Sequence, residues 1–180
     1  VIDLQGKTMT PGFIEGHGHF MGLGYNELNL DLMNVTSYEE MVEKVKEAVA
    51  KAQPGQWIIG RGWHQDKWTK QPEKMIKGFQ THQMLSAVSP DNPVFLKHAS
   101  GHAGFANAKA MQLAGVNQLS VEKLGKDMGE GGEILLDELG NPTGLFNERA
   151  QSLISQYIPD NTEETDRQAL ELAIAASLRN

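Results

Sequence analysis

The segment from Thr10 to His19 constrains the fold most strongly, because it places two histidines at the end of a short strand. A Pro-Gly turn precedes Phe13 and Ile14, and side chains two residues apart in a strand point to the same face. His17 and His19 are therefore predicted to project together. Paired imidazoles form half of a site for a divalent metal, and nitrogen ligands suit zinc. A His-x-His pair alone arises often by chance, but the preceding turn and apolar strand favour metal ligation.

Several segments of the chain together resemble a known protein family. Residues 1–19 are similar to the lead-in to the barrel of the amidohydrolase superfamily, where a Pro-Gly-Phe-Ile-Asp-x-His-x-His pattern joins a small β-sandwich to the first strand of a (β/α)8 barrel. Glu15 stands where this pattern has Asp. Residues 57–63, 101–107 and 142–148 resemble the branch called amidohydrolase family 3, which carries a large insertion after the first barrel strand.

The resemblance implies an α/β fold, as an incomplete piece of a (β/α)8 TIM-barrel metal-dependent hydrolase. A whole barrel needs about 200 to 250 residues, whereas this chain has 180. Residues 1–36 are expected to hold the end of a β-sandwich strand and the first barrel strand, 37–143 the insertion subdomain, and 144–180 the return toward the barrel helices. In the family, further metal-ligand histidines and a catalytic aspartate lie on later strands. We therefore expect an N-terminal fragment of a larger enzyme, inactive alone.

Local patterns predict alternating helices and strands, which indicates the α/β class. Ser37 and Glu40 form a capping box that begins a helix, and Thr162 caps a last helix. The apolar face of that last helix is predicted to comprise Leu170, Ala173, Ile174 and Leu178. Other predicted elements are strands over 57–60 and 94–96, a loop over 86–91, a hairpin with arms over 133–137 and 144–146, and helices over 107–114 and 149–157.

Two residues are candidates to bridge metal ions. Glu148 follows a strand-like segment, and in related metal enzymes a carboxylate or a carboxylated lysine bridges two metals at a comparable place. Lys97, which follows the predicted strand 94–96, is the alternative bridge if it is carboxylated. The structural alternatives are a first-turn helix residue for Glu148 and a lysine that reaches solvent for Lys97, the second of which we favour.

His102 is the candidate catalytic residue. It lies in a segment that resembles the family's Asp-Gly-His-x-x-x-x-Asn pattern, with Ser100 in place of the Asp. A histidine on a loop after a strand can polarise a carbonyl or donate a proton. The alternative is a buried structural histidine. Asn107, at the end of this pattern, is predicted to cap the following helix, and His82 and His98 receive no assignment.

Arg61 and Trp63 are candidates for binding substrate. Arg61 lies between two glycines, and a guanidinium binds a carboxylate through two parallel hydrogen bonds. Trp63 and the nearby Trp68 either wall a pocket or pack the core of the insertion, and packing is the favoured interpretation.

The implied function is hydrolysis of an amide or related C–N bond in a small-molecule substrate. One or two divalent ions, predicted to be zinc, would activate water for attack on the carbonyl. The alternative is a non-catalytic domain that binds a ligand or a partner. Because a barrel strand without neighbours exposes backbone donors and an apolar face, the fragment is expected to self-associate.

Composition excludes several other classes of function. The net charge of −7 argues against binding to nucleic acid or an anionic membrane. No run of 18 apolar residues occurs, so the sequence contains no predicted membrane span. The chain has no cysteine, so it has neither a disulfide nor a thiolate site. This composition is compatible with a cytoplasmic or a periplasmic location.

Overall fold

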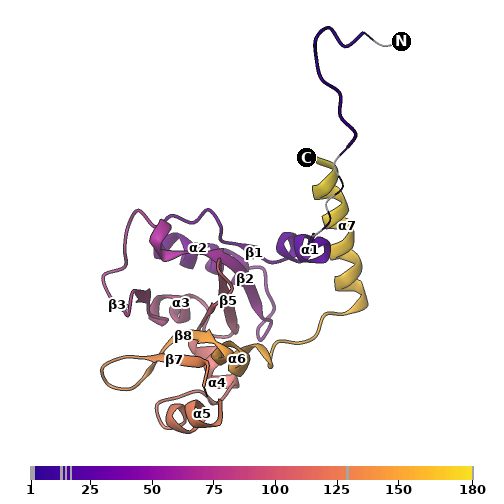
Figure 1. Ribbon diagram of the computed structural model, residues 1–180. Coiled ribbons are helices and arrows are strands. Elements are labelled where there is room, and N and C mark those ends of the chain that lie inside the picture. Colours follow the sequence, from indigo (N-terminus) through magenta and orange to yellow (C-terminus); the bar gives the residue numbers. More distant parts are fainter. Residues whose placement is uncertain (1–2, 13, 15, 17, 129, 180) are drawn as a thin grey trace.

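A mixed six-stranded sheet forms the body of the molecule (Figure 1). The computed structural model describes residues 3–12, 14, 16, 18–128 and 130–179. Strands β1, β2 and β5 run parallel, and β5, β6, β8 and β7 pair antiparallel in that order. A separate two-stranded hairpin, β3–β4, lies outside this sheet. The strands are β1 (Leu30–Asp31), β2 (Ile58–Trp63), β3 (Met75–Ile76), β4 (Phe79–Gln80), β5 (Val94–His98), β6 (Ala103–Ala106), β7 (Gly132–Leu136) and β8 (Pro142–Glu148).

Helices cover both faces of the sheet. Alternate residues of β5 point to opposite sides, so its side chains show which helices pack on each face. Val94 and Leu96 join a core cluster with α2 and α3, whereas Phe95 joins a second cluster with α4 and α6. A strand buried on both faces reads as a continuous apolar run, as the sequence of β5 does. The helices are α1 (Phe20–Leu28), α2 (Tyr38–Val49), α3 (Gln83–Val88), α4 (Ala108–Leu113), α5 (Val121–Met128), α6 (Ser152–Ser155) and α7 (Glu163–Arg179), with 3-10 turns η1 (Gln65–Lys67) and η2 (Arg149–Gln151).

Side-chain caps begin the helices where the sequence predicts them. The Ser37 hydroxyl accepts a hydrogen bond from the Glu40 backbone at 3.1 Å, but the Glu40 carboxylate reaches one residue further back, to the backbone N–H of Thr36 at 2.7 Å. Asn107 accepts from Ala110 at 2.9 Å and also from Val94 at 3.0 Å, so this cap ties α4 to the sheet. The predicted hairpin and the α/β class are confirmed. The predicted loop over 86–91 is wrong in its first half, because α3 extends to residue 88.

The last helix, α7, packs against α1 beside the sheet body (Figure 1). A Cβ on Gly24 would lie only 1.8 Å from the carbonyl oxygen of Ala169, so the two helices approach through small side chains. Consequently Ala169, Ala173 and Ala176 are the buried residues of α7. The predicted apolar face is correct for Ala173 but wrong for its larger members, Leu170, Ile174 and Leu178, which are 43%, 46% and 83% exposed.

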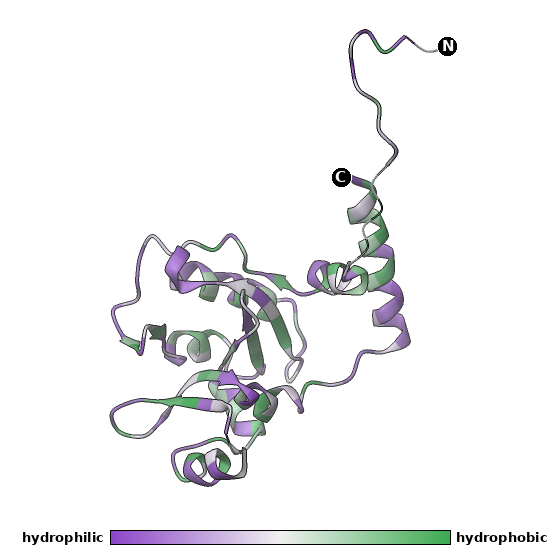
Figure 2. Cartoon of the chain, viewed as in Figure 1, coloured by the Kyte–Doolittle hydropathy of each residue, from purple (hydrophilic) through white to green (hydrophobic). Residues whose placement is uncertain are grey.

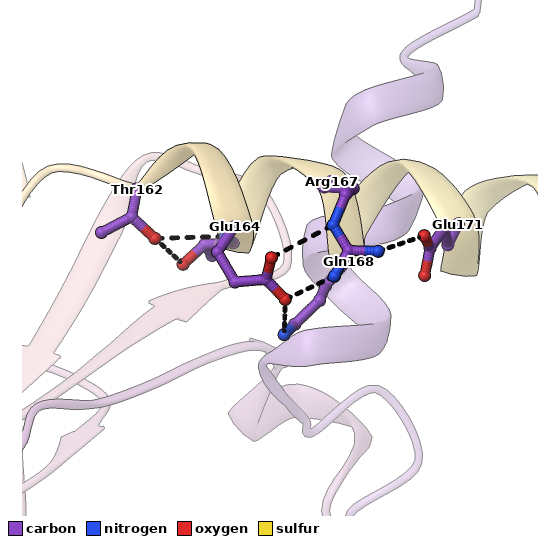
Figure 3. A network of polar contacts seen from close by, with 6 residues as sticks. Thr162, Glu164, Arg167, Gln168 and Glu171 are labelled. Carbon is purple, nitrogen blue, oxygen red and sulfur yellow. Dashed lines mark hydrogen bonds and ion pairs between the residues drawn. The ribbon is translucent and has the colours of Figure 1, made fainter.

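The first turns of α7 are hydrophilic and the later turns hydrophobic, as Figure 2 shows. Thr162 caps the helix by accepting from Thr165 at 3.1 Å. Arg167 then pairs with Glu164 at 2.7 Å and with Glu171 at 2.6 Å (Figure 3). These pairs are exposed, and such pairs three or four residues apart add only about 0.2–0.5 kcal/mol each to a helix. These charged residues therefore form a solvent-exposed surface of α7, and we assign no binding or catalytic role to them.

The N-terminal segment does not form the predicted barrel strand in the part that the structure describes. Residues 3–12 are exposed and contain neither helix nor strand, and His19 is an exposed residue directly before α1. A strand needs a neighbour for its backbone hydrogen bonds, and no described strand pairs with these residues. His17 lies outside the described residues. The domain boundary predicted after residue 143 falls inside β8, the strand that links β6 to β7.

Candidate functional site

Two of the predicted site residues, His102 and Glu148, meet at one hollow in the sheet body. The sheet register explains this, because Ala103 of β6 pairs with Asn147 of β8, so the residues next to them face each other across the ladder. The Glu148 backbone N–H accordingly donates to the His102 carbonyl at 2.8 Å. The hollow encloses about 410 Å³, and its lining includes Phe79, His98, His102, Ala103, Glu133 and Glu148.

The His102 imidazole and the Glu148 carboxylate form a direct polar pair. His102 Nδ1 lies 3.0 Å from Oε1 and 3.2 Å from Oε2 of Glu148, and both side chains are exposed. With Nδ1–H donating to the carboxylate, a neutral His102 carries no proton on Nε2, which leaves that nitrogen able to accept a proton or a metal. A carboxylate that orients an imidazole is a common arrangement in both acid–base and metal sites.

Glu148 has an unusual backbone conformation, with φ of 49° and ψ of −124°. Such strained conformations cost about 1–3 kcal/mol for a residue other than glycine and persist where the surroundings hold them. Here the backbone bond to His102 and a bond from Arg149 N–H to the Gly131 carbonyl, at 3.2 Å, hold the turn between β8 and η2. Glu148 is not a residue of the first helical turn, which was the structural alternative. It directly precedes η2, and its side chain makes no capping hydrogen bond. Strain of this kind clusters at functional sites.

His98 is a lining residue that the sequence interpretation left unassigned. It is the last residue of β5 and only 7% exposed. Its Nδ1 accepts from the Ser100 backbone N–H at 3.1 Å and lies 2.8 Å from the Ser100 hydroxyl, whereas its Nε2 is buried without a hydrogen-bond partner among the described residues. Burial, assisted by the neighbouring His64, lowers the pKa of His98 and keeps the ring neutral. Its position at the carboxyl end of a parallel strand was the available signal.

The other sequence candidates lie elsewhere. Trp63 has no exposed surface, donates from Nε1 to the Leu96 carbonyl at 2.9 Å, and therefore packs the core, the alternative that the sequence favoured over substrate binding. Arg61 is exposed and lines a different hollow of about 280 Å³, with Asp31 among its neighbours. Lys97 is exposed on β5, in keeping with a lysine that reaches solvent.

The donor types at the hollow suit a metal ion, although the described residues do not complete a site. Carboxylate oxygen and imidazole nitrogen are both zinc ligands, and Glu148 and His102 place one of each beside the hollow. Within the described ranges, no three His, Asp or Glu side chains gather closely enough to hold a metal. His17, one member of the predicted ligand pair, lies outside those ranges. Among the described helices, none has the length and apolarity needed to cross a bilayer.

The chain is similar in sequence to known hydrolases. The chain is 34% identical over 173 residues to the putative amidohydrolase YtcJ of Bacillus subtilis, covering 96% of this chain and 30% of that protein. It is 33% identical to the N-substituted formamide deformylase of Arthrobacter pascens, covering 92% of this chain and 29% of the relative.

Solved structures and a family model agree with these relatives. The crystal structure of an uncharacterized metal-dependent hydrolase from Pyrococcus furiosus matches with a TM-score of 0.57 and 28% identity, over 94% of this chain and 30% of that one. The chain thus spans about 30% of the length of the YtcJ relative and of this structural neighbour. The model of the amidohydrolase family matches residues 1–180. The chain, which carries His102 and Glu148 side by side at the edge of a mixed sheet, belongs to the amidohydrolase family.

Proposed function

We propose that this chain forms part of a metal-dependent hydrolase that cleaves an amide or a related C–N bond. The observation that carries the proposal is the His102–Glu148 pair at the hollow, with Nδ1 3.0 Å from the carboxylate. Two relatives support it, one named as an N-substituted formamide deformylase and one described as a metal-dependent hydrolase. Because the chain spans about 30% of their length, the activity is proposed for a protein as long as these relatives.

His17, His19 and Glu148 are proposed to hold a divalent ion, which we propose to be zinc. Nitrogen and oxygen donors of this kind match zinc chemistry, and the Glu148 carboxylate is exposed beside the hollow. When bound, the ion supplies acidified water and polarisation of the substrate carbonyl. The segment with the two histidines is proposed to become the first strand of a (β/α)8 barrel. The sheet body would then be the insertion, extended through Glu148 because β8 is part of the sheet.

His102 is proposed to serve the reacting amide directly. The Glu148 carboxylate accepts from Nδ1 and fixes the orientation of the ring, which leaves Nε2 for the substrate. When protonated, the ring donates from Nε2 to the carbonyl oxygen or to the leaving nitrogen, with its positive charge beside Glu148. The backbone hydrogen bond from the Glu148 N–H to the His102 carbonyl, at 2.8 Å, keeps the two residues adjacent for this pairing. Arg61, in its separate hollow, has no part in the proposal.

Elemental analysis of the dialysed chain tests the metal ligands. Wild-type protein is expected to retain divalent metal, and the His17→Ala/His19→Ala and Glu148→Gln variants are expected to lose it, because each removes a ligand. A His82→Gln variant, altered far from the hollow in sequence, serves as the matched control. Equal metal content in all four proteins would contradict the ligand assignment. Binding of an amide without turnover, in a protein of the relatives' full length, would favour the alternative of a non-catalytic binding domain.

A further inference from the structure

Hydrogen bonds at Ser100 connect the end of β5 to the backbone of His102. Ser100 binds the imidazole of His98, the last residue of β5, and accepts a hydrogen bond from the His102 backbone. We propose that His98 is a positioning residue, which acts through Ser100 and holds His102 where its ring pairs with the Glu148 carboxylate. This inference rests on the proposed function, because it names what keeps the proposed catalytic residue in place.

The direction of each bond follows from the atoms involved. The Ser100 backbone N–H can only donate, so His98 Nδ1, at 3.1 Å, accepts with its lone pair. The His102 backbone N–H donates to the Ser100 hydroxyl oxygen at 3.2 Å, and the hydroxyl proton is free to donate to the same Nδ1 at 2.8 Å. The series of bonds therefore runs from His102 through Ser100 to His98, and it requires a His98 Nδ1 that carries no proton.

His98 is fixed in position by the sheet body. It is 7% exposed, and the rings of Trp63 and His64 lie against it, with centroids 4.7 and 4.5 Å away. The next residue, Ala99, donates from its backbone to the Trp63 carbonyl at 2.9 Å, which ties the start of the loop to β2. The His102 side chain, by contrast, is 72% exposed. Packing alone therefore does not hold His102, and its hydrogen bonds must do so.

The opposite side of the loop is held by β8 and η2. The Glu148 backbone N–H donates to the His102 carbonyl at 2.8 Å, and the Gln151 side-chain amide donates to the Gly101 carbonyl at 3.0 Å. These bonds use carbonyl groups of the loop, whereas Ser100 uses the His102 N–H. His102 is thus held between β5 and β8, and loss of the Ser100 hydroxyl should free it on the side of β5.

The protonation of His98 makes this positioning sensitive to acid. Burial, assisted by the neighbouring His64, lowers the pKa of His98. A loop freed from these bonds leaves His98 with a pKa nearer its ordinary value of about 6.5, so the bonds to Nδ1 are fully formed above that pH and are lost as the pH falls below it. The titratable and charged groups around the ring are Asp66, which opposes the lowering, His64, His102 and Lys67, which add to it, and Glu133 and Glu148, which line the same hollow.

Amide hydrogen exchange of the 180-residue protein, followed by nuclear magnetic resonance, tests the role of Ser100. Ser100→Ala removes the hydroxyl of an exposed residue, so the fold should persist, and the His102 backbone N–H should exchange about tenfold faster, as for loss of one hydrogen bond. Ser86→Ala is the matched control, because its hydroxyl also lies 2.8 Å from a histidine Nδ1 and accepts from a backbone N–H, but outside the hollow. Equal exchange of the His102 N–H in wild type and Ser100→Ala would overturn the proposal.

Two substitutions test His98 itself in the same protein. His98→Phe keeps a ring without an acceptor, whereas His98→Asn keeps an amide oxygen close to the place of Nδ1 and does not titrate. During an acid titration, the Ser100 N–H signal should shift with a midpoint below the ordinary histidine value of about 6.5 in the wild type, and it should stay in place in His98→Asn. A protonated Nδ1 at neutral pH, seen with ¹⁵N-labelled histidines, or the same acid shift in His98→Asn would overturn the proposal.

Kinetics of a protein of the relatives' full length separate this inference from the proposed function. Ser100→Ala and His98→Phe are expected to lower kcat for an N-substituted formamide about tenfold with little change in KM, because they displace a catalytic group and leave substrate binding intact. His98→Asn should recover most of the kcat. Chelator-sensitive turnover with the same kcat in wild type, Ser100→Ala and His98→Phe would overturn the positioning role and leave the hydrolase intact. Faster His102 exchange in Ser100→Ala, in a protein without any turnover, would support the positioning and contradict the hydrolase.

Discussion

The sheet body and the α1/α7 pair differ in how they are held together. In the body, large side chains such as Phe105 and Phe146 are completely buried, and both faces of the sheet are covered. In the α1/α7 pair, Gly24 meets the backbone of Ala169, while Leu178 remains 83% exposed. The body therefore has its own apolar core, whereas α1 and α7 are joined through a close approach of small residues.

The candidate site residues are divided between these two regions. His98, His102 and Glu148 are all positioned by strands of the body, so their arrangement follows from the core of this chain. His19, which is needed for the proposed metal site, precedes α1 in the other region and is exposed. The proposed metal site thus joins one half that the body positions to a second half whose predicted strand is not formed in the described residues.

The largest effect is expected from truncating the core of the body. Phe105→Ala should lower the free energy of unfolding by about 3–5 kcal/mol, because it removes a fully buried aromatic ring and leaves a cavity. Leu178→Ala, on the exposed side of α7, should change it by less than about 0.5 kcal/mol. Urea denaturation measures both. Similar losses in the two variants would mean that α7 is as well packed as the body.

A smaller and local effect is expected at the junction of α1 and α7. In Gly24→Ala the added Cβ would lie 1.8 Å from Ala169 O, so the helices must separate, at about 1–3 kcal/mol for overpacking. Hydrogen exchange should accelerate in α1 and α7 and stay unchanged in β5. Gly22→Ala is the matched control, since its Cβ meets only His19 Cβ at 3.4 Å. Faster exchange in β5 would show that the two regions unfold together.

The backbone of Glu148 gives a third, finer test within the body. Both Glu148→Gly and Glu148→Ala lose the pair with His102, but glycine tolerates a φ of 49° without strain. The glycine variant should therefore be more stable than the alanine variant by about 1 kcal/mol. Thermal or urea unfolding of the two proteins decides this. Equal stability would indicate that the turn relaxes and that Glu148 is not held under strain.

The weakest expected effect is self-association, which stays a prediction. Leu170, Ile174 and Leu178 are exposed apolar residues of α7, and exposed apolar patches promote association. We expect a second copy of the chain to pack on this side, and sedimentation at rising concentration should show dimers or larger species. Replacing the three residues with lysine should shift the equilibrium to monomer. A wild-type chain that stays monomeric at high concentration would contradict the prediction.

Local signals in the sequence predicted what depends on near neighbours. The caps at Ser37, Asn107 and Thr162 and the hairpin of β7 and β8 follow from residues within a few positions of each other. The pairing of His102 with Glu148 was not predicted as a contact, although both were chosen as site residues. Their encounter depends on the register of β6 and β8, which no local pattern specifies.

Long-range packing explains the remaining differences. The buried side of α7 is set by α1, whose close approach at Gly24 selects alanines over leucines, and helical periodicity alone cannot reveal this. The burial of His98 depends on Trp63 from the adjacent strand β2. The predicted strand before His19 needs a sheet neighbour, which the described residues do not provide.

The most direct test of the central claim is amide hydrolysis by a protein of the relatives' full length, measured with and without a metal chelator. N-substituted formamides and acetamides are the probes, and Glu148→Gln is assayed beside the wild type. The account predicts turnover that the chelator abolishes, that added zinc restores, and that Glu148→Gln lowers about 10- to 100-fold, as for a ligand or orienting group in a metal site. Turnover that is insensitive to the chelator and to Glu148→Gln would contradict it.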